Sequence, residues 1–287
     1  TRDLTEAPPV DPLAIAITES GQPLVEGSAF NRVVTPVVST TGGVSPIAVT
    51  ATVDGVPWTS GSPVSADGDH TLVVTATDSG TPPQAKTLTR HFRIDRQGPV
   101  VSVVSPVSGA VVPALSVLVT GSAGDAVSLT VNAIPVPLGE GGAFATAVLL
   151  AEGTNLLRLA AIDAAGNQTV VVHPVVLDSL PPVLSLTSPA FGTCLSAGSS
   201  LTVSGRASDA HPRTPGAPEG PAVSLTLTPP SGAATTVAAT PDASGAFSAS
   251  LPISEGLDGS ATLLVTASDA LGHSSRALAT VRVDGTD

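Results

Sequence analysis

Apolar and polar side chains alternate in three stretches that repeat one another, at residues 68–78, 153–163 and 259–269. Each stretch has Gly at its first position, Ala two residues before its end, and Asp at its last position. A period of two places alternate side chains on one face of a β-strand, so the pattern predicts a half-buried strand in each copy. Glycine and aspartate are typical of the turns that bound such strands. The predicted inward positions share one parity: Leu72, Val74 and Ala76, then Leu157, Leu159 and Ala161, then Leu263, Val265 and Ala267.

The segments around these stretches also repeat and divide the chain. A second alternating segment follows each copy and ends at Asp95, Asp178 and Asp284. After the first two of these, a short proline-containing segment leads into closely similar strand patterns at residues 99–106 and 182–189. The third unit carries an insertion rich in proline and glycine at residues 210–221. We therefore predict a linker at residues 1–10 and three domains at residues 11–97, 98–180 and 181–287.

Composition agrees with a fold made of strands and turns. The chain has 28 Gly and 27 Pro in 287 residues, and no long run of apolar residues has the 3.6-residue period of a helix. Aromatic residues make up 2% of the sequence, so the predicted cores are filled by Val, Leu, Ile and Ala. Each domain has room for about seven short strands. We predict an all-β fold of three tandem immunoglobulin-like β-sandwich domains.

The charge balance excludes some classes of partner. The formal net charge is −12, and Lys86 is the only lysine. Nucleic acids and anionic lipids bind to basic patches, so we expect neither as a partner. Apolar runs are only as long as strands, and we expect no insertion into a membrane. Because the sequence starts at Thr1 and contains no Met, we expect it to be a mature or excised segment of a larger precursor.

Particular strings in the sequence resemble known repeats. VTATVDGVPWTSG at 49–61 and DGDHTLVVTATD at 67–78 resemble the bacterial immunoglobulin-like (Big-type) repeats of large surface proteins. The second and third domains share the patterns GAF at 142–144 and 245–247, and the second contains EGTN and IDAAGN. These two domains are similar to the Ig-like domain found beside glucodextranase-type enzymes. The resemblance implies an extracellular, non-catalytic role, because these motifs are structural.

No catalytic motif accompanies this pattern. The strings GxSxG, GxGxxG and the P-loop are absent, and the five histidines have no metal-ligand spacing. His91 and His173 fall on predicted closing strands, where we expect outward-facing or edge residues. We expect no enzyme activity, no catalytic residue and no cofactor site in this chain.

Calcium binding is the most specific hypothesis for a site. Aspartates recur at turns and domain ends, and Ca²⁺ takes six to eight oxygen ligands. The candidates in the hypothesis are Asp78, Asp95, Asp163, Asp178 and Asp269, with Asp209 and Asp284 in the same pattern. Aspartate is also typical of turns because its side chain bonds to the nearby backbone. Without a DxDxDG loop, the sequence favours the turn interpretation.

Two single residues and one loop remain to be interpreted. Cys194 aligns with Val111, so we expect a buried core side chain in preference to a reactive thiol. Trp58 is either a stacking platform for sugar rings or a packed side chain, and its isolation favours packing. A direct ligand site would have to use Trp58 or the loop at 210–221.

The expected function is structural. The repeats predict a stalk or spacer array of a larger bacterial cell-surface protein, adhesin or fibre, with an extracellular location. The alternatives are a non-catalytic accessory region of a secreted polysaccharide-degrading enzyme and a glycan- or ligand-binding module. The expected partners are neighbouring Ig-like domains of the same or a like chain. A glycan or protein of the cell surface is a further candidate partner.

Overall fold

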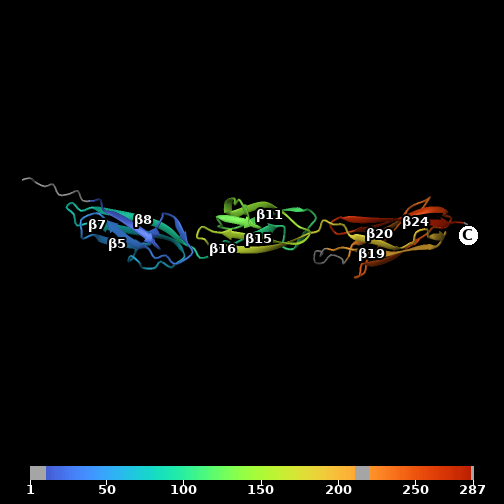
Figure 1. The fold of residues 1–287 in the computed structure, drawn as a ribbon, viewed down its shortest axis with the longest axis horizontal. Helices are drawn as coiled ribbons and strands as arrows, with labels where there is room; N and C mark the ends of the chain where they lie inside the picture. Colours follow the sequence, from blue (N-terminus) through green and yellow to red (C-terminus); the bar gives the residue numbers. More distant parts are fainter. Residues whose placement is uncertain (1–10, 211–219, 286–287) are drawn as a thin grey trace, which may run out of the picture. The chain divides into compact units, whose positions relative to one another are not determined.

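A computed structural model describes residues 11–210 and 220–285. The predicted linker at 1–10 and most of the insertion at 210–221 lie outside the described residues. The described part contains strands β1 to β24 and one short 3₁₀ helix, η1 (Glu140–Gly142). The strands form three sandwiches, each made of a three-stranded and a five-stranded sheet (Figure 1). The predicted all-β fold of three tandem Ig-like sandwiches is confirmed.

The first sandwich pairs a sheet of order β2-β1-β4 with a sheet of order β3-β8-β7-β5-β6. Strands β3 and β8 run parallel, and β8, β7, β5 and β6 pair antiparallel. The strands are β1 (Ala14–Glu19), β2 (Gln22–Pro23), β3 (Ser28–Phe30), β4 (Val37–Thr41), β5 (Ala48–Val53), β6 (Val56–Pro57), β7 (Gly68–Thr77) and β8 (Ala85–Ile94).

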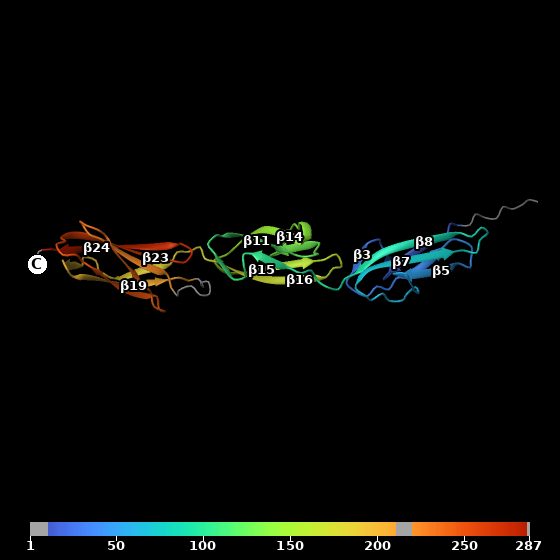
Figure 2. The same cartoon turned by 180° about the vertical axis from the view of Figure 1, so that it is seen from behind.

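The middle sandwich repeats the larger sheet with the order β10-β16-β15-β12-β13, and its smaller sheet has the order β14-β11-β9 (Figure 2). The β10–β16 pair is parallel, as the corresponding pair in the first sandwich is. The strands are β9 (Ser102–Ser105), β10 (Ala110–Val112), β11 (Ser116–Ser122), β12 (Ser128–Val131), β13 (Ile134–Val136), β14 (Ala143–Leu149), β15 (Gly153–Ile162) and β16 (Gln168–Leu177).

The third sandwich has the same design, with sheets of order β17-β19-β22 and β18-β24-β23-β20-β21. Its parallel pair is β18–β24. The strands are β17 (Val183–Ser188), β18 (Cys194–Ser196), β19 (Ser200–Ser208), β20 (Ala222–Thr228), β21 (Thr235–Ala239), β22 (Ala246–Pro252), β23 (Gly259–Ser268) and β24 (Ser274–Asp284).

The three repeated sequence stretches form β7, β15 and β23, each near the centre of its larger sheet. Their predicted inward side chains are all buried, at 1% exposure or less. β7 pairs antiparallel with β8, and β15 lies next to β16 in its sheet. The β23–β24 hairpin pairs Gly259 with Val283 through Ser268 with Ser274. The alternating pattern therefore places one face of each long hairpin in a core, which stabilises the sandwich by removing apolar surface from water.

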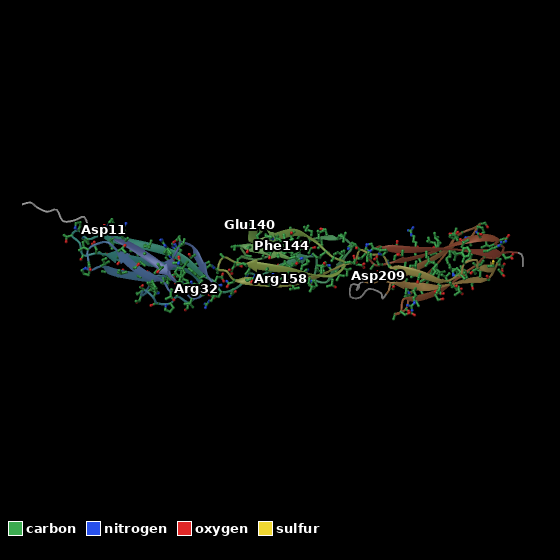
Figure 3. All side chains as sticks on the ribbon, viewed as in Figure 1. Asp11, Arg32, Glu140, Phe144, Arg158 and Asp209 are labelled. Carbon is green, nitrogen blue, oxygen red and sulfur yellow. The ribbon has the colours of Figure 1, made fainter. Side chains whose placement is uncertain are left out.

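A phenylalanine packs against a glycine of the neighbouring strand in two of the cores. Phe144 on β14 and Phe247 on β22 are buried (Figure 3 shows Phe144). A Cβ atom at Gly121 on β11 would lie 2.8 Å from the Phe144 ring, and one at Gly205 on β19 would lie 2.8 Å from the Phe247 ring. The absence of a side chain at these glycines is what makes room for the rings.

Two expectations about single residues are wrong. Cys194 is exposed, because β18 is a short edge strand on which Leu195 faces inward and Cys194 therefore faces outward. His173 is buried, and its Nε2 lies 2.9 Å from the carbonyl oxygen of Pro106. The carbonyl gives this ring a polar partner in the core, which the strand pattern alone did not reveal.

The described chain packs as two compact units, and the division runs through the middle sandwich. Of the described residues, the first unit comprises 11–104, 120–145 and 158–172, and the second comprises 105–119, 146–157, 173–210 and 220–285. Among residues 11–210 and 220–285, no helix is long and apolar enough to cross a membrane.

Candidate metal centres

Within the described part of the chain, two groups of acidic and histidine side chains come together at corresponding places in the repeat, one group within each compact unit. Asp95, Asp125 and Asp163 form the first cluster, and Asp178, Asp269 and His273 form the second cluster. In each cluster, one candidate ligand atom per residue lies within 4.8 Å of the others. In each cluster, an Asp that directly follows the last strand of one domain (Asp95 or Asp178) lies near the Asp that follows the central strand of the next domain (Asp163 or Asp269).

Asp163 begins the turn between β15 and β16 and is held by its own turn. Its Oδ1 accepts a hydrogen bond from the Asn167 backbone N at 2.8 Å, and its Oδ2 accepts one from Asn167 Nδ2 at 2.8 Å. Burial is the largest influence on the Asp163 pKa and acts to raise it. The hydrogen bonds from Asn167, together with those from the backbone of Ala165 and Gly166, outweigh burial, so the pKa is lowered and the carboxylate is ionised at neutral pH.

Asp269 has the same position between β23 and β24. Its Oδ1 accepts hydrogen bonds from the backbone N of Leu271 at 2.9 Å and of His273 at 2.8 Å, and its Oδ2 lies 2.7 Å from His273 Nδ1. Burial again raises the pKa of Asp269, and the bonds and charge of His273 outweigh it, so that the pKa is lowered. His273 thus replaces the amide of Asn167 with an imidazole.

Asn167 also connects the turn after β15 to the residues that follow β8. Its Nδ2 lies 2.8 Å from the carbonyl oxygen of Asp95 and 3.1 Å from that of Gln97. The Asp95 carboxylate accepts from the Gln97 backbone N at 3.1 Å and lies 3.4 Å from Arg93 Nε. Asp95 and Asp163 are therefore brought together by the Asn167 side chain and by the path of the backbone.

The two clusters offer different ligand chemistry. The first cluster contains carboxylate oxygens alone, which is the donor set that Ca²⁺ and Mg²⁺ prefer. The second cluster adds an imidazole nitrogen, which suits Zn²⁺ and other transition metals. Three side chains supply fewer than the six to eight oxygens that Ca²⁺ takes, so backbone carbonyls and water would have to complete its coordination.

The structure separates the predicted candidates. Asp95 and Asp163 lie in the first cluster, and Asp178 and Asp269 lie in the second. Asp78 belongs to neither cluster and organises its own loop: it accepts hydrogen bonds from the backbone N of Val44, Gly80 and Gln84. The bonds from Val44 and Gln84 lower its pKa.

Asp125 and His273 are cluster members that the sequence did not single out as candidate metal ligands. Asp125 aligns with Asp209 in the repeat, and His273 aligns with Asn167. Both alignments could have pointed to these residues. What the sequence did not reveal is that the loop carrying Asp125 approaches the turn carrying Asp163.

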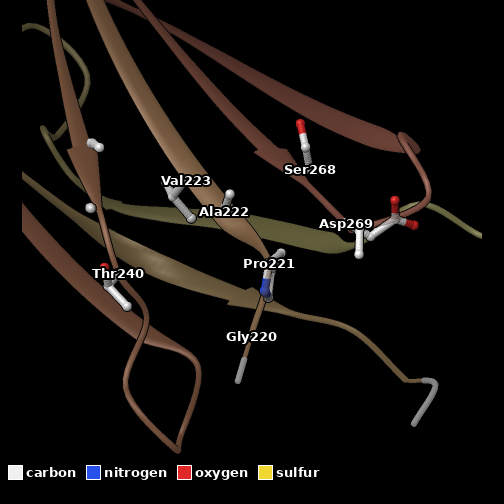
Figure 4. A pocket seen from close by; sticks show the side chains of 10 residues that line it. Gly220, Pro221, Ala222, Val223, Thr240, Ser268 and Asp269 are labelled. Atoms are coloured by element: carbon white, nitrogen blue, oxygen red, sulfur yellow. The ribbon is translucent and has the colours of Figure 1, made fainter. Parts of the chain in front are cut away.

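The other proposed ligand sites have different outcomes. Trp58 packs, partly buried, against the first core, and its Nε1 donates to the carbonyl oxygen of Ser62 at 3.2 Å, which confirms the packing interpretation. Beside Gly220 and Pro221, a cavity of about 390 Å³ opens at the end of the third sandwich (Figure 4). Small apolar side chains line most of it, and Asp269 is the one charged residue in the described lining.

Comparisons with known proteins agree with the fold. Residues 99–179 match the family model described as glucodextranase, domain B. A comparison with curated proteins finds no match. Among solved structures, a variant of a three-Ig fragment of titin is 10% identical, covers 94% of this chain and 99% of its own, and has a TM-score of 0.50. A tetra-tandem repeat from the extending region of a large adhesion protein is 20% identical, covers 95% of this chain and 74% of its own, and has a TM-score of 0.34.

The titin likeness concerns the fold alone, because fold is shared far more widely than function. The family match covers the middle domain and leaves the other two outside it. Together with the sheet order, these findings establish that the chain is a tandem of three Ig-like β-sandwich domains whose middle domain is similar to glucodextranase domain B.

Proposed function

We propose that this chain is an extracellular structural array, a spacer or stalk within a larger bacterial cell-surface protein, adhesin or fibre. The observation that carries the proposal is the repetition of one design. Three sandwiches share the strand order of their larger sheets, and the first and third have distinct cores of buried apolar side chains, most of them aliphatic. Such units fold around their own cores and set a distance between the segments that flank them.

A tethering experiment tests the spacer function. The chain is placed between a surface anchor and a fluorescent binding domain, and the distance between the two is compared with that in versions lacking one domain. A spacer predicts that each deletion shortens the distance and leaves binding by the attached domain unchanged. If the chain alone binds insoluble polysaccharide or host glycans, or if the distance is insensitive to the number of domains, the spacer proposal is wrong.

The second candidate function is that of an accessory region of a secreted polysaccharide-degrading enzyme. The observation that favours it is the match of residues 99–179 to glucodextranase domain B. The sequence of the complete parent protein tests it directly. A glycosidase domain in the same polypeptide supports the accessory role, whereas further Ig-like repeats support the stalk.

Divalent cations are proposed as ligands of the first cluster, because its three carboxylates lie together. Calorimetry of the full chain with Ca²⁺ and with excess chelator tests this. A ligand that binds only the folded state adds about 2.7 kcal/mol at one hundred times its Kd. Asp125→Asn should abolish the rise in melting temperature, while Glu140→Gln, an exposed carboxylate of the same sandwich, should preserve it. An unchanged melting temperature would leave these aspartates as turn formers.

A further inference from the structure

His70 is a polar side chain in a row of apolar ones. It is the third residue of β7, it is 6% exposed, and it shares the inward parity of Leu72 and Val74. Its ring lies 5.3 Å from the ring of Phe92 on the neighbouring strand β8. A histidine in this position is expected to have partners for both ring nitrogens, because an unsatisfied polar group in a core is costly.

Both partners of the His70 ring are hydrogen-bond acceptors. Nδ1 lies 2.7 Å from Asp54 Oδ2, and Nε2 lies 2.9 Å from the carbonyl oxygen of Ala66. A carbonyl oxygen and an ionised carboxylate can only accept, and a neutral imidazole carries one N–H. The two bonds can form together only when the ring carries both protons.

We infer that His70 is held as an imidazolium that ties the turn after β5 to the loop before β7, and that it makes the first sandwich sensitive to pH. Asp54 lies in the β5–β6 turn, and Ala66 lies in the segment that leads into β7. The charged ring thus joins two segments that approach the same end of the central strand. Loss of one proton removes one of the two bonds and leaves either the Asp54 carboxylate or the Ala66 carbonyl facing a ring nitrogen without hydrogen.

In the middle sandwich a neutral side chain makes one of these two bonds, the one to the segment that leads into the central strand. Asn155 is the third residue of β15, as His70 is of β7, and its Nδ2 donates to the carbonyl oxygen of Ala151 at 2.7 Å. Both side chains therefore bond to the carbonyl four residues earlier. In the third sandwich the corresponding residue is Ala261, which is fully buried and offers no hydrogen bond. Only the first of these three positions carries an ionisable side chain, so a pH response of this particular tie belongs to the first sandwich.

The electrostatic surroundings support this protonation state. Burial is the largest influence on the His70 pKa and acts to lower it. The bond to Ala66, the bond to Asp54, and the charges of Asp54 and Asp69 together outweigh burial and raise the pKa. Burial likewise acts to raise the pKa of Asp54, and the bonds from Thr71 and His70 outweigh it, so this pKa is lowered.

The sign of the pH dependence follows from these directions. The stabilisation from His70 is complete below the ordinary imidazole pKa of about 6.5 and is lost as pH rises through the higher pKa of the folded state. The contribution of Asp54 is present above its ordinary pKa and is lost as pH falls through its lowered one. The pair therefore stabilises the first sandwich most in mildly acidic to neutral solution.

Two variants of the full chain separate the charged tie from simple packing. In the unmodified chain, the Thr71 backbone N–H donates to Asp54 Oδ1 at 2.8 Å, and Asp54→Asn keeps an oxygen that can accept this bond. Asparagine also tolerates the positive φ of 52° at this turn. It turns Oδ2 into an N–H donor, which a neutral His70 ring can accept at Nδ1. His70→Asn imitates Asn155. His91→Gln is the control, since His91 also contacts a carboxylate, that of Glu26, but is exposed.

The first measurement is a pH titration of the histidine ring nitrogens by ¹⁵N NMR, with His70 assigned by its loss in His70→Asn. We expect His70 to carry both protons at pH 6 and to titrate above the reference histidine value, and to become singly protonated at pH 6 in Asp54→Asn. The second is hydrogen exchange of β7 and β8 between pH 6 and pH 9. As pH rises, exchange in the unmodified chain and in His91→Gln should accelerate by more than the intrinsic effect of pH. This extra acceleration should vanish in Asp54→Asn and in His70→Asn.

Either of two results would overturn the inference. The first is a singly protonated His70 ring at pH 6 in the unmodified chain. The second is an extra acceleration of exchange that persists in Asp54→Asn, since it would then come from another group.

Discussion

Replacing Gly121 with Ala should strongly destabilise the middle sandwich. A Cβ atom there would lie 2.1 Å from the carbonyl oxygen of Ser102 and 2.8 and 2.9 Å from two atoms of the Phe144 ring. Ordinary carbon contacts are about 3.3 Å to oxygen and about 3.5 Å to carbon, so roughly 1 Å of space is missing. The oxygen belongs to the backbone of β9 and the ring is buried, so neither can move without disturbing the sheet or the core.

The expected cost is at the upper end of what overpacking costs, about 3 kcal/mol. For a domain of this size, 1 kcal/mol corresponds to a shift in melting temperature of roughly 4–8 °C, so Tm should fall by roughly 12–24 °C. Hydrogen exchange measured by mass spectrometry on the full chain assigns the loss, because protection should fall in β11 and β14 and remain in the other two sandwiches.

Gly139→Ala is the matched control in the same sandwich. Its Cβ would lie 3.5 Å from the Ala143 carbonyl oxygen, an ordinary contact, and its φ of −93° suits any residue. This change should leave stability within about 0.5 kcal/mol. If Gly121→Ala behaves like Gly139→Ala, the reasoning about the Phe144 contact is refuted.

Three further changes test other contacts. Leu263→Ala, at a fully buried position, should lower the free energy of unfolding of the third sandwich by about 2–5 kcal/mol, measured in urea. Leu278→Ala, at a position 72% exposed, should lower it by less than about 0.5 kcal/mol, and equal losses would contradict the assigned core. Arg32→Ala should raise the pH at which acid unfolds the first sandwich. Burial acts to raise the pKa of Glu19, and the hydrogen bonds to its carboxylate, led by that from Arg32, lower the pKa. The stability that Glu19 contributes above its ordinary pKa is lost as pH falls through its pKa in the folded state, and this loss comes at a higher pH without Arg32. Cys194 should react with a thiol reagent in the native chain as fast as in urea, and a thiol protected until unfolding would restore the core interpretation.

The alternating pattern predicted the strands well because it records burial directly. Every inward position named from the sequence in β7, β15 and β23 is buried, and the strand boundaries agree with the Gly and Asp that bound them. The prediction that Cys194 is buried failed, because it rested on an alignment with Val111 and not on an alternating pattern. In a three-residue edge strand, a side chain's direction depends on which neighbour faces inward, and alternation over so few residues does not decide it.

The clusters show a different limit of sequence reasoning. Aspartates at turns and domain ends were visible as a repeat, yet Asp78 holds its own loop while Asp163 meets Asp95 and Asp125. Which carboxylates meet depends on how the loops of a domain approach the segment that leads into that same domain. That approach is set by side chains such as Asn167, whose amide bonds to two carbonyls some 70 residues earlier in the chain.

Within one repeated frame, the positions that vary are those at the ends of the central strands. The apolar side chains inside β7, β15 and β23 must stay apolar because each loses contact with water on folding. The third residue of these strands can be histidine, asparagine or alanine, and the turn after them can hold Asn167 or His273. The polar side chains among these have hydrogen-bond partners nearby, and the alanine is buried among apolar neighbours. Three sandwiches of the same fold can therefore differ in their response to protons and cations. In a spacer, such differences would let a change of pH loosen one domain while the other two stay folded.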